Sequence, residues 1–94
     1  MHEMGIANSI LEAVHKELHL YPGQRAAKIG VRIGELAGVD PESLQFCFEA
    51  LVKGTEFEPL ELEIEWCPAQ DGNTADQLDL AYLELEDVAQ EVVA

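Results

Sequence analysis

The chain has 94 residues, the size of one small domain, and its 48% hydrophobic and 26% charged residues are ordinary for a protein that folds. Its 19 acidic and 5 basic residues give a net charge of −14, which argues against nucleic-acid binding. This charge favours the binding of cations or of basic partner surfaces. The simpler interpretation is that it keeps the protein soluble. No stretch approaches the roughly 20 apolar residues of a membrane span. With no signal peptide and no disulfide framework, we expect a cytoplasmic protein that does not engage a membrane.

The first predicted element is an amphipathic helix over residues 3–19. Its apolar residues recur at the helical spacings of three and four: Ala7, Ile10, Leu11, Val14 and Leu18. Pro22 and Gly23 then end the helix and turn the chain.

A strand is predicted next, over residues 26–36. Its β-branched residues alternate with polar residues and glycines, which places Ile29, Val31 and Ile33 on one face. Gly30 and Gly34 weaken the strand intrinsically, so we expect another group to pack close against their face.

A second helix is predicted to begin at Asp40 and Pro41. Asp40 can cap the unpaired amides and Pro41 suits the first helical position, while Gly54 marks the end of the helix. Its apolar stripe consists of Leu44, Cys47, Phe48, Leu51 and Val52.

Two strands close the chain, over about 60–66 and 79–86. Leu78 and Leu80 are out of phase with the alternation of the last strand, which indicates a bulge or a change of register near residue 80. The connection over 68–77 is a polar turn, and because it is short we expect these two strands to run antiparallel.

The order helix, strand, helix, strand, strand predicts a single two-layer α+β domain over residues 1–94. In this arrangement the two helices cover one face of a three-stranded sheet, and the polar strand faces point to water.

Catalytic motifs are absent from the sequence. It holds no nucleophile elbow, no glycine-rich phosphate loop and no His-Glu-x-x-His run, and the carboxylates of its strands are explained by solvated faces. We therefore predict that the protein is not an enzyme.

The N-terminus carries different chemistry. The chain opens Met1-His2-Glu3, and an N-terminal amine, backbone amide nitrogens and an imidazole can form fused chelate rings. This planar, all-nitrogen arrangement suits Ni(II) or Cu(II), and Glu3 can add a carboxylate or support the ligands. The alternative is a frayed terminus without a role.

His15 and His19 are a second possible pair of ligands. They are four residues apart on the first helix, a spacing that allows two imidazoles to share one metal ion. The simpler interpretation is that they are two exposed histidines on the polar side of that helix.

Over most of its length the chain resembles the HypA/HybF family of hydrogenase nickel-incorporation proteins. The resemblance covers residues 1–68 and extends to the closing strand at 78–88. It rests on Met1-His2-Glu3-Met4, Ile33-Gly34-Glu35-Leu36-Ala37-Gly38-Val39, Pro41-Glu42-Ser43-Leu44, Phe46, Phe48-Glu49, Lys53-Gly54-Thr55 and Leu60-Glu61-Leu62-Glu63-Ile64.

The resemblance implies a nickel metallochaperone that delivers Ni(II) for the maturation of nickel–iron hydrogenase. The implied partners are a companion maturation GTPase and the hydrogenase large subunit, and for some members urease accessory proteins. The implied nickel site is Met1, His2 and Glu3. Asp40 stands where some members have a residue implicated near the nickel, although a helix cap is the simpler explanation of Asp40.

The sequence departs from the family in one respect. Family members carry two Cys-x-x-Cys pairs that hold a structural zinc, whereas here Cys67 stands alone before the turn over 68–77. Because one cysteine cannot build a tetrahedral thiolate site, we expect no zinc. The loss of this lobe leaves open a second interpretation, a non-metal interaction module that keeps partner binding without delivering nickel.

Overall fold

The computed structural model describes residues 2–69 and 76–88. Its elements follow in the predicted order: α1 (Glu3–Leu18), β1 (Gln24–Gly34), α2 (Pro41–Val52), β2 (Glu61–Cys67) and β3 (Leu78–Asp87). Strand β1 begins and ends two residues earlier than predicted. It ends at Gly34 because the Ala37 N–H donates to the Gly34 carbonyl at 3.0 Å and closes a turn there. No helix of the described residues is long and apolar enough to cross a membrane.

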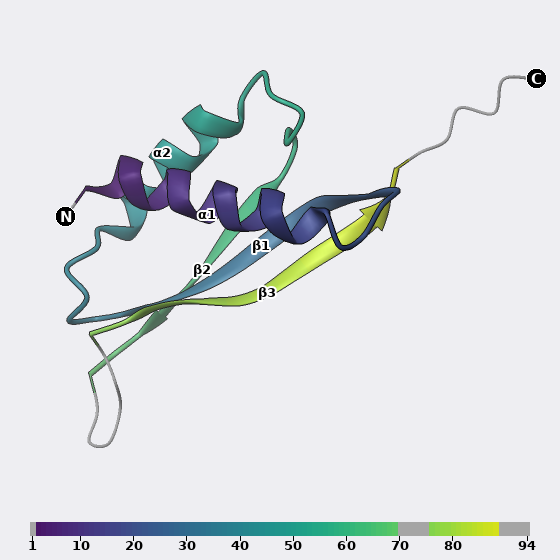
Figure 1. The fold of residues 1–94 in the computed structure, drawn as a ribbon. Helices are drawn as coiled ribbons and strands as arrows, with labels where there is room; N and C mark the ends of the chain where they lie inside the picture. Colours follow the sequence, from purple (N-terminus) through teal and green to yellow (C-terminus); the bar gives the residue numbers. More distant parts are fainter. Residues whose placement is uncertain (1, 70–75, 89–94) are drawn as a thin grey trace, which may run out of the picture.

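The two helices lie together on one face of the three-stranded sheet (Figure 1), which confirms the predicted two-layer α+β fold. Helix α1 packs against β1, α2 packs against β2, and the helices pack against each other. The largest fully buried side chains come from both helices and the central strand: Phe48, Ile33, Leu44, Val14 and Val31. The apolar stripes of the helices and the alternation of β1 therefore meet in one core.

The strand order is β2-β1-β3, with β1 parallel to β2 and antiparallel to β3. Strands β2 and β3 thus run in opposite directions, as predicted, but they lie at opposite edges of the sheet and do not pair with each other. Both described ends of the connection between them meet the end of β1: the Gly34 N–H donates to the Gln77 carbonyl at 2.9 Å and the Glu35 N–H to the Cys67 carbonyl at 2.8 Å. Residues 70–75 of the predicted turn over 68–77 lie outside the described residues.

Strand β3 contains the predicted change of register. Gly30 pairs with Tyr82 and the next residue, Val31, pairs with Leu80, so Ala81 is an extra residue on β3. Strict alternation along β3 would place Leu80 on the polar face. Because of the bulge, Leu80 instead lies opposite Val31, a core residue of β1, and so on the helix-covered face of the sheet.

The other face of the sheet is polar, as the alternation predicted. Three ion pairs connect β1 to its neighbours, namely Arg25–Glu86 at 2.6 Å, Lys28–Glu63 at 3.6 Å and Arg32–Glu65 at 3.2 Å.

The ring of Tyr82 covers Gly30 on this polar face, where a Cβ atom would lie 2.1 Å from the ring. The expectation of a close neighbour at Gly30 is therefore confirmed. The absence of a side chain at this position creates the space that the ring occupies.

Candidate functional site

His2 lies immediately before α1, as its N-cap, with φ −89° and ψ 86°. Its carbonyl accepts the first helical hydrogen bond, from the Ile6 N–H at 3.1 Å. Its imidazole is exposed and makes no capping hydrogen bond to the helix. The ring can therefore turn toward a ligand without breaking a capping contact.

The backbone around His2 also offers nitrogen atoms. The amides at the start of an α-helix have no acceptor within the helix, and the first intrahelical donor here is Ile6. The amides of His2 and Glu3 precede it, so the helix does not compete for them. Met1, whose amine completes the predicted ligand set, lies outside the described residues.

Glu3 joins the N-terminal turn of α1 to the start of α2. Its Oε2 accepts a hydrogen bond from the backbone N–H of Asp40 at 3.2 Å, across 37 positions of the sequence. This contact fixes the carboxylate one residue from the imidazole of His2, and brings together Glu3 and Asp40 from the predicted set.

Asp40 caps α2, as predicted. Its Oδ1 accepts from the N–H groups of Glu42 at 3.0 Å and Ser43 at 3.4 Å, and its Oδ2 accepts from the Ser43 hydroxyl at 3.3 Å. The carboxylate is thus engaged by the first turn of its own helix, where the helix dipole also favours a negative charge.

These side chains do not by themselves form a metal cage. Among residues 2–69 and 76–88, no group of three or more His, Cys, Asp or Glu side chains could hold a metal ion. A metal ion at His2 would therefore need backbone nitrogen atoms in addition to the imidazole, which is the kind of site that the sequence predicts.

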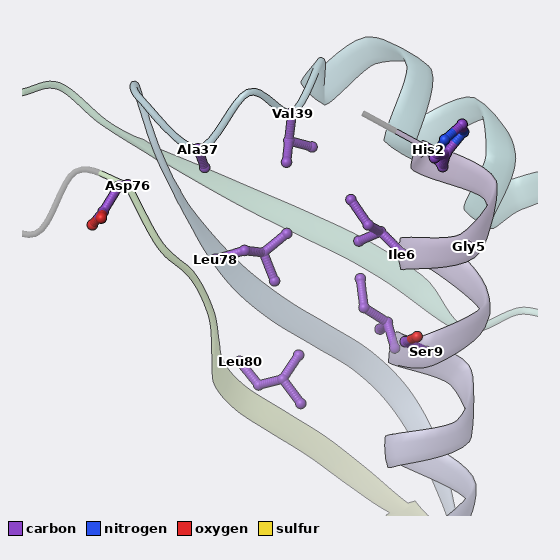
Figure 2. Close-up of a pocket in the computed structure, with 10 residues that line it drawn as sticks. His2, Gly5, Ile6, Ser9, Ala37, Val39, Asp76, Leu78 and Leu80 are labelled. Carbon is purple, nitrogen blue, oxygen red and sulfur yellow. The ribbon is translucent and has the colours of Figure 1, made fainter.

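An apolar groove of about 550 Å³ begins at His2 and runs between α1 and β3 (Figure 2). The helices pack mainly against β1 and β2, and the groove lies over β3. Its lining comes from three segments: His2, Gly5, Ile6, Ser9 and Ile10 of α1 and its cap, Ala37 and Val39 of the following loop, and Asp76, Leu78 and Leu80. The groove was not predicted from the sequence, although the out-of-phase residues Leu78 and Leu80, which line it, were an indication of it.

Two side chains of the polar sheet face, Glu63 and Tyr82, have shifted pKa values. Tyr82 donates a hydrogen bond of 2.5 Å to Glu63, which lowers the pKa of that carboxyl, and Lys28 lowers it further. The same hydrogen bond raises the pKa of Tyr82 to about 12. This pair connects β2 to β3 across β1 and holds the phenol ring over Gly30.

Comparison with protein families matches residues 1–71 to the family described as hydrogenase/urease nickel incorporation, metallochaperone, HypA. Proteins named hydrogenase maturation factor HypA share this region. The Chlorobium limicola protein is 48% identical over 65 residues, which cover 69% of this chain and 56% of the relative. A Geobacter protein is 44% identical over 78 residues, which cover 77% of this chain and 68% of the relative.

A more distant relative from Methanopyrus kandleri is 40% identical over 65 residues, covering 69% of this chain and 46% of the relative. The chain therefore spans between 46% and 68% of the length of these three proteins. The shared region contains His2, Glu3 and Asp40 together with both helices and the parallel strand pair. This chain belongs to the HypA family.

Proposed function

We propose that this chain binds one Ni(II) ion at its N-terminal segment and delivers it as cargo for the maturation of nickel–iron hydrogenase. The observation that carries the proposal is the position of His2. Its imidazole is exposed and uncapped at the start of α1, beside amides that the helix leaves without acceptors. Membership of a nickel-incorporation family supports nickel as the cargo.

The proposed ligands are the imidazole and backbone amide nitrogen of His2 and, where Met1 is the first residue, its amine. Together they form fused chelate rings with a planar geometry that suits Ni(II). The Glu3 carboxylate, which accepts a hydrogen bond from the Asp40 N–H, supports these ligands from the neighbouring position. Asp40 contributes by holding Glu3 in place. Because the nitrogens bind without their protons, nickel affinity rises with pH and binding releases protons.

Delivery requires release to a partner with a better ligand set. We infer that the partners are a companion maturation GTPase and the hydrogenase large subunit, with urease accessory proteins as a further recipient class. The role proposed is transport and not catalysis. We also infer that the chain takes no structural zinc through thiolates, because Cys67 is the single cysteine at the turn where the family's zinc lobe would stand.

A second candidate function is a protein-interaction module that has lost nickel delivery. The groove beside His2 favours it, because Leu80 is 49% exposed there and offers apolar surface to a partner. Nickel binding separates the two candidates, since an interaction module has no need of His2 as a ligand.

The test is calorimetric titration of the untagged chain with Ni(II). We expect one tight equivalent, and a nitrogen-rich, planar Ni(II) spectrum. His2→Ala should abolish the tight equivalent with little change in stability, because the imidazole is exposed. The matched control is His19→Ala, which removes a different exposed histidine and should leave the tight equivalent intact. Unchanged tight binding by the His2→Ala variant would overturn the proposal.

A further inference from the structure

Two histidine rings of α1 lie against each other at the end of the helix remote from His2. The ring centroids of His15 and His19 are 5.0 Å apart and the ring planes are perpendicular. Both side chains are exposed, and the His15 ring also contacts Phe57 edge to face, with centroids 6.0 Å apart. The helix therefore presents two imidazoles close together on its surface, and Phe57 lies beside the His15 ring.

This separation fits two imidazoles bound to one metal ion. With metal–nitrogen bonds of about 2.0–2.1 Å, the centroids of two neighbouring imidazole ligands lie roughly 4.5–5.3 Å apart. The observed 5.0 Å falls inside that interval, so the backbone and the helical spacing already hold the rings at the required distance. Rotation of exposed side chains about their own bonds, which is fast, turns the nitrogens inward.

The surroundings of the pair favour a cation. The two histidines line a groove of about 420 Å³ that also contains Glu56 and Arg25. Arg25 is paired with Glu86 at 2.6 Å, so its charge is offset, while Glu56 adds a negative charge. His19 is also the C-cap of α1, where the partial negative charge of the helix dipole favours positive ions.

We propose that His15 and His19 form a second, weaker site for a divalent transition-metal ion of the Ni(II) or Zn(II) class. Imidazole suits both ions. Because the described residues contain no group of three or more ligand side chains, water completes the coordination. The site is distinct from the N-terminal one, since His2 and His15 are 13 positions apart in the sequence, which corresponds to roughly 20 Å at 1.5 Å per helical residue.

The alternative to a metal site is an edge-to-face packing contact without a ligand. His15→Phe separates the two interpretations, because it keeps a ring against Phe57 and removes the ligand nitrogens. His19→Ala removes the other imidazole. The double variant His19→Ala/Leu20→His keeps the number of histidines but moves the second ring out of the i, i+4 register, at a residue that is 69% exposed.

The experiment titrates the full chain carrying His2→Ala with Ni(II), and separately with Zn(II), by calorimetry. We expect one equivalent of saturable binding. Substitution of groups that only support a metal ligand already weakens binding about 10–100-fold, so loss of a ligand in each variant should weaken it at least tenfold. In nuclear magnetic resonance spectra, Zn(II) should shift the ring signals of His15 and His19 together.

Circular dichroism establishes that the variants keep their helices. Equal affinity of His15→Phe and its parent for both ions would overturn the proposal, as would full binding by the out-of-register double variant. Binding of one ion only would identify the cation that the site takes. Because the parent already lacks His2, this result does not depend on whether the N-terminal proposal holds.

Discussion

The carboxylate of Glu3 accepts a hydrogen bond from the backbone N–H of Asp40 at 3.2 Å, and so connects the first turn of α1 to the cap of α2. Asp40 in turn accepts from the amides of Glu42 and Ser43. The two acidic side chains, one from the start of each helix, thus accept from three amides at the start of α2 that the helix leaves unpaired. His2 precedes this junction by one residue, so its backbone is held by the packing of two helices.

Replacing Glu3 should weaken this junction. Glu3→Ala removes an exposed hydrogen bond and a favourable charge in the first turn of α1, so we expect the free energy of unfolding to fall by about 1 kcal/mol. Glu3→Gln keeps an acceptor for the Asp40 N–H and should recover part of the loss. Urea denaturation of the two variants measures both effects, and equal stability of Glu3→Ala and the parent would show that the junction contributes nothing.

Asp40 provides a test that distinguishes a helix cap from a nickel ligand. Asp40→Ala should cost about 1 kcal/mol of stability, whereas Asp40→Asn should cost only a few tenths because asparagine caps helices equally well. Since the carboxylate is engaged by α2, we expect Asp40→Asn to bind nickel like the parent protein. A folded Asp40→Asn variant that no longer binds nickel would instead assign the carboxylate to the metal.

The helices and their caps could be predicted from sequence because their causes are local. Helical spacing of apolar residues and the Asp40-Pro41 pair define α2, and similar spacing defines α1. The strand order could not be predicted in the same way. Placing β1 between β2 and β3 depends on pairing between distant segments, which alternation within one strand does not specify.

The candidate site, too, could be predicted from the sequence only where local features determine it. His2 and Glu3 could be selected from their position and chemistry together with the family resemblance, and Asp40 from the resemblance, with a helix cap as its alternative role. The hydrogen bond between Glu3 and Asp40 could not, because it exists only through the packing of α1 on α2. The apolar groove also follows from tertiary structure, since the bulge at Ala81 places Leu80 opposite Val31 while the helices pack mainly against β1 and β2.

Gly30 should be intolerant of a side chain. A Cβ atom there would lie 2.1 Å from the Tyr82 ring, which its hydrogen bond to Glu63 holds in place. We expect Gly30→Ala to destabilise the protein by about 1–3 kcal/mol, the usual cost of overpacking. In a Tyr82→Ser background the same substitution should cost much less, because the ring is gone. A double-mutant cycle by urea denaturation checks this, and equal costs in both backgrounds would rule out the clash.

The hydrogen bond from Tyr82 to Glu63 should stabilise the polar sheet face only within a limited pH range. It requires a protonated phenol and an ionised carboxyl. Because the folded pKa of Glu63 lies below its usual 4.5, its stabilising effect is present above that value and is lost as pH falls through the folded pKa. Because the pKa of Tyr82 is raised from 10.0 to about 12, its effect is present below pH 10 and is lost as pH rises through about 12.

Substitution of either partner should move the titration of the other. In Glu63→Gln the phenol loses its anionic acceptor, so the pKa of Tyr82 should return toward 10.0. In Tyr82→Phe the carboxyl loses its donor, so the pKa of Glu63 should rise toward 4.5, with Lys28 still holding it slightly lower. Titration of the tyrosine and glutamate side-chain signals by nuclear magnetic resonance follows both groups. If Tyr82 titrated identically with and without the Glu63 carboxylate, the hydrogen bond could not be the cause of its raised pKa, and the ring would have to be held over Gly30 by packing alone.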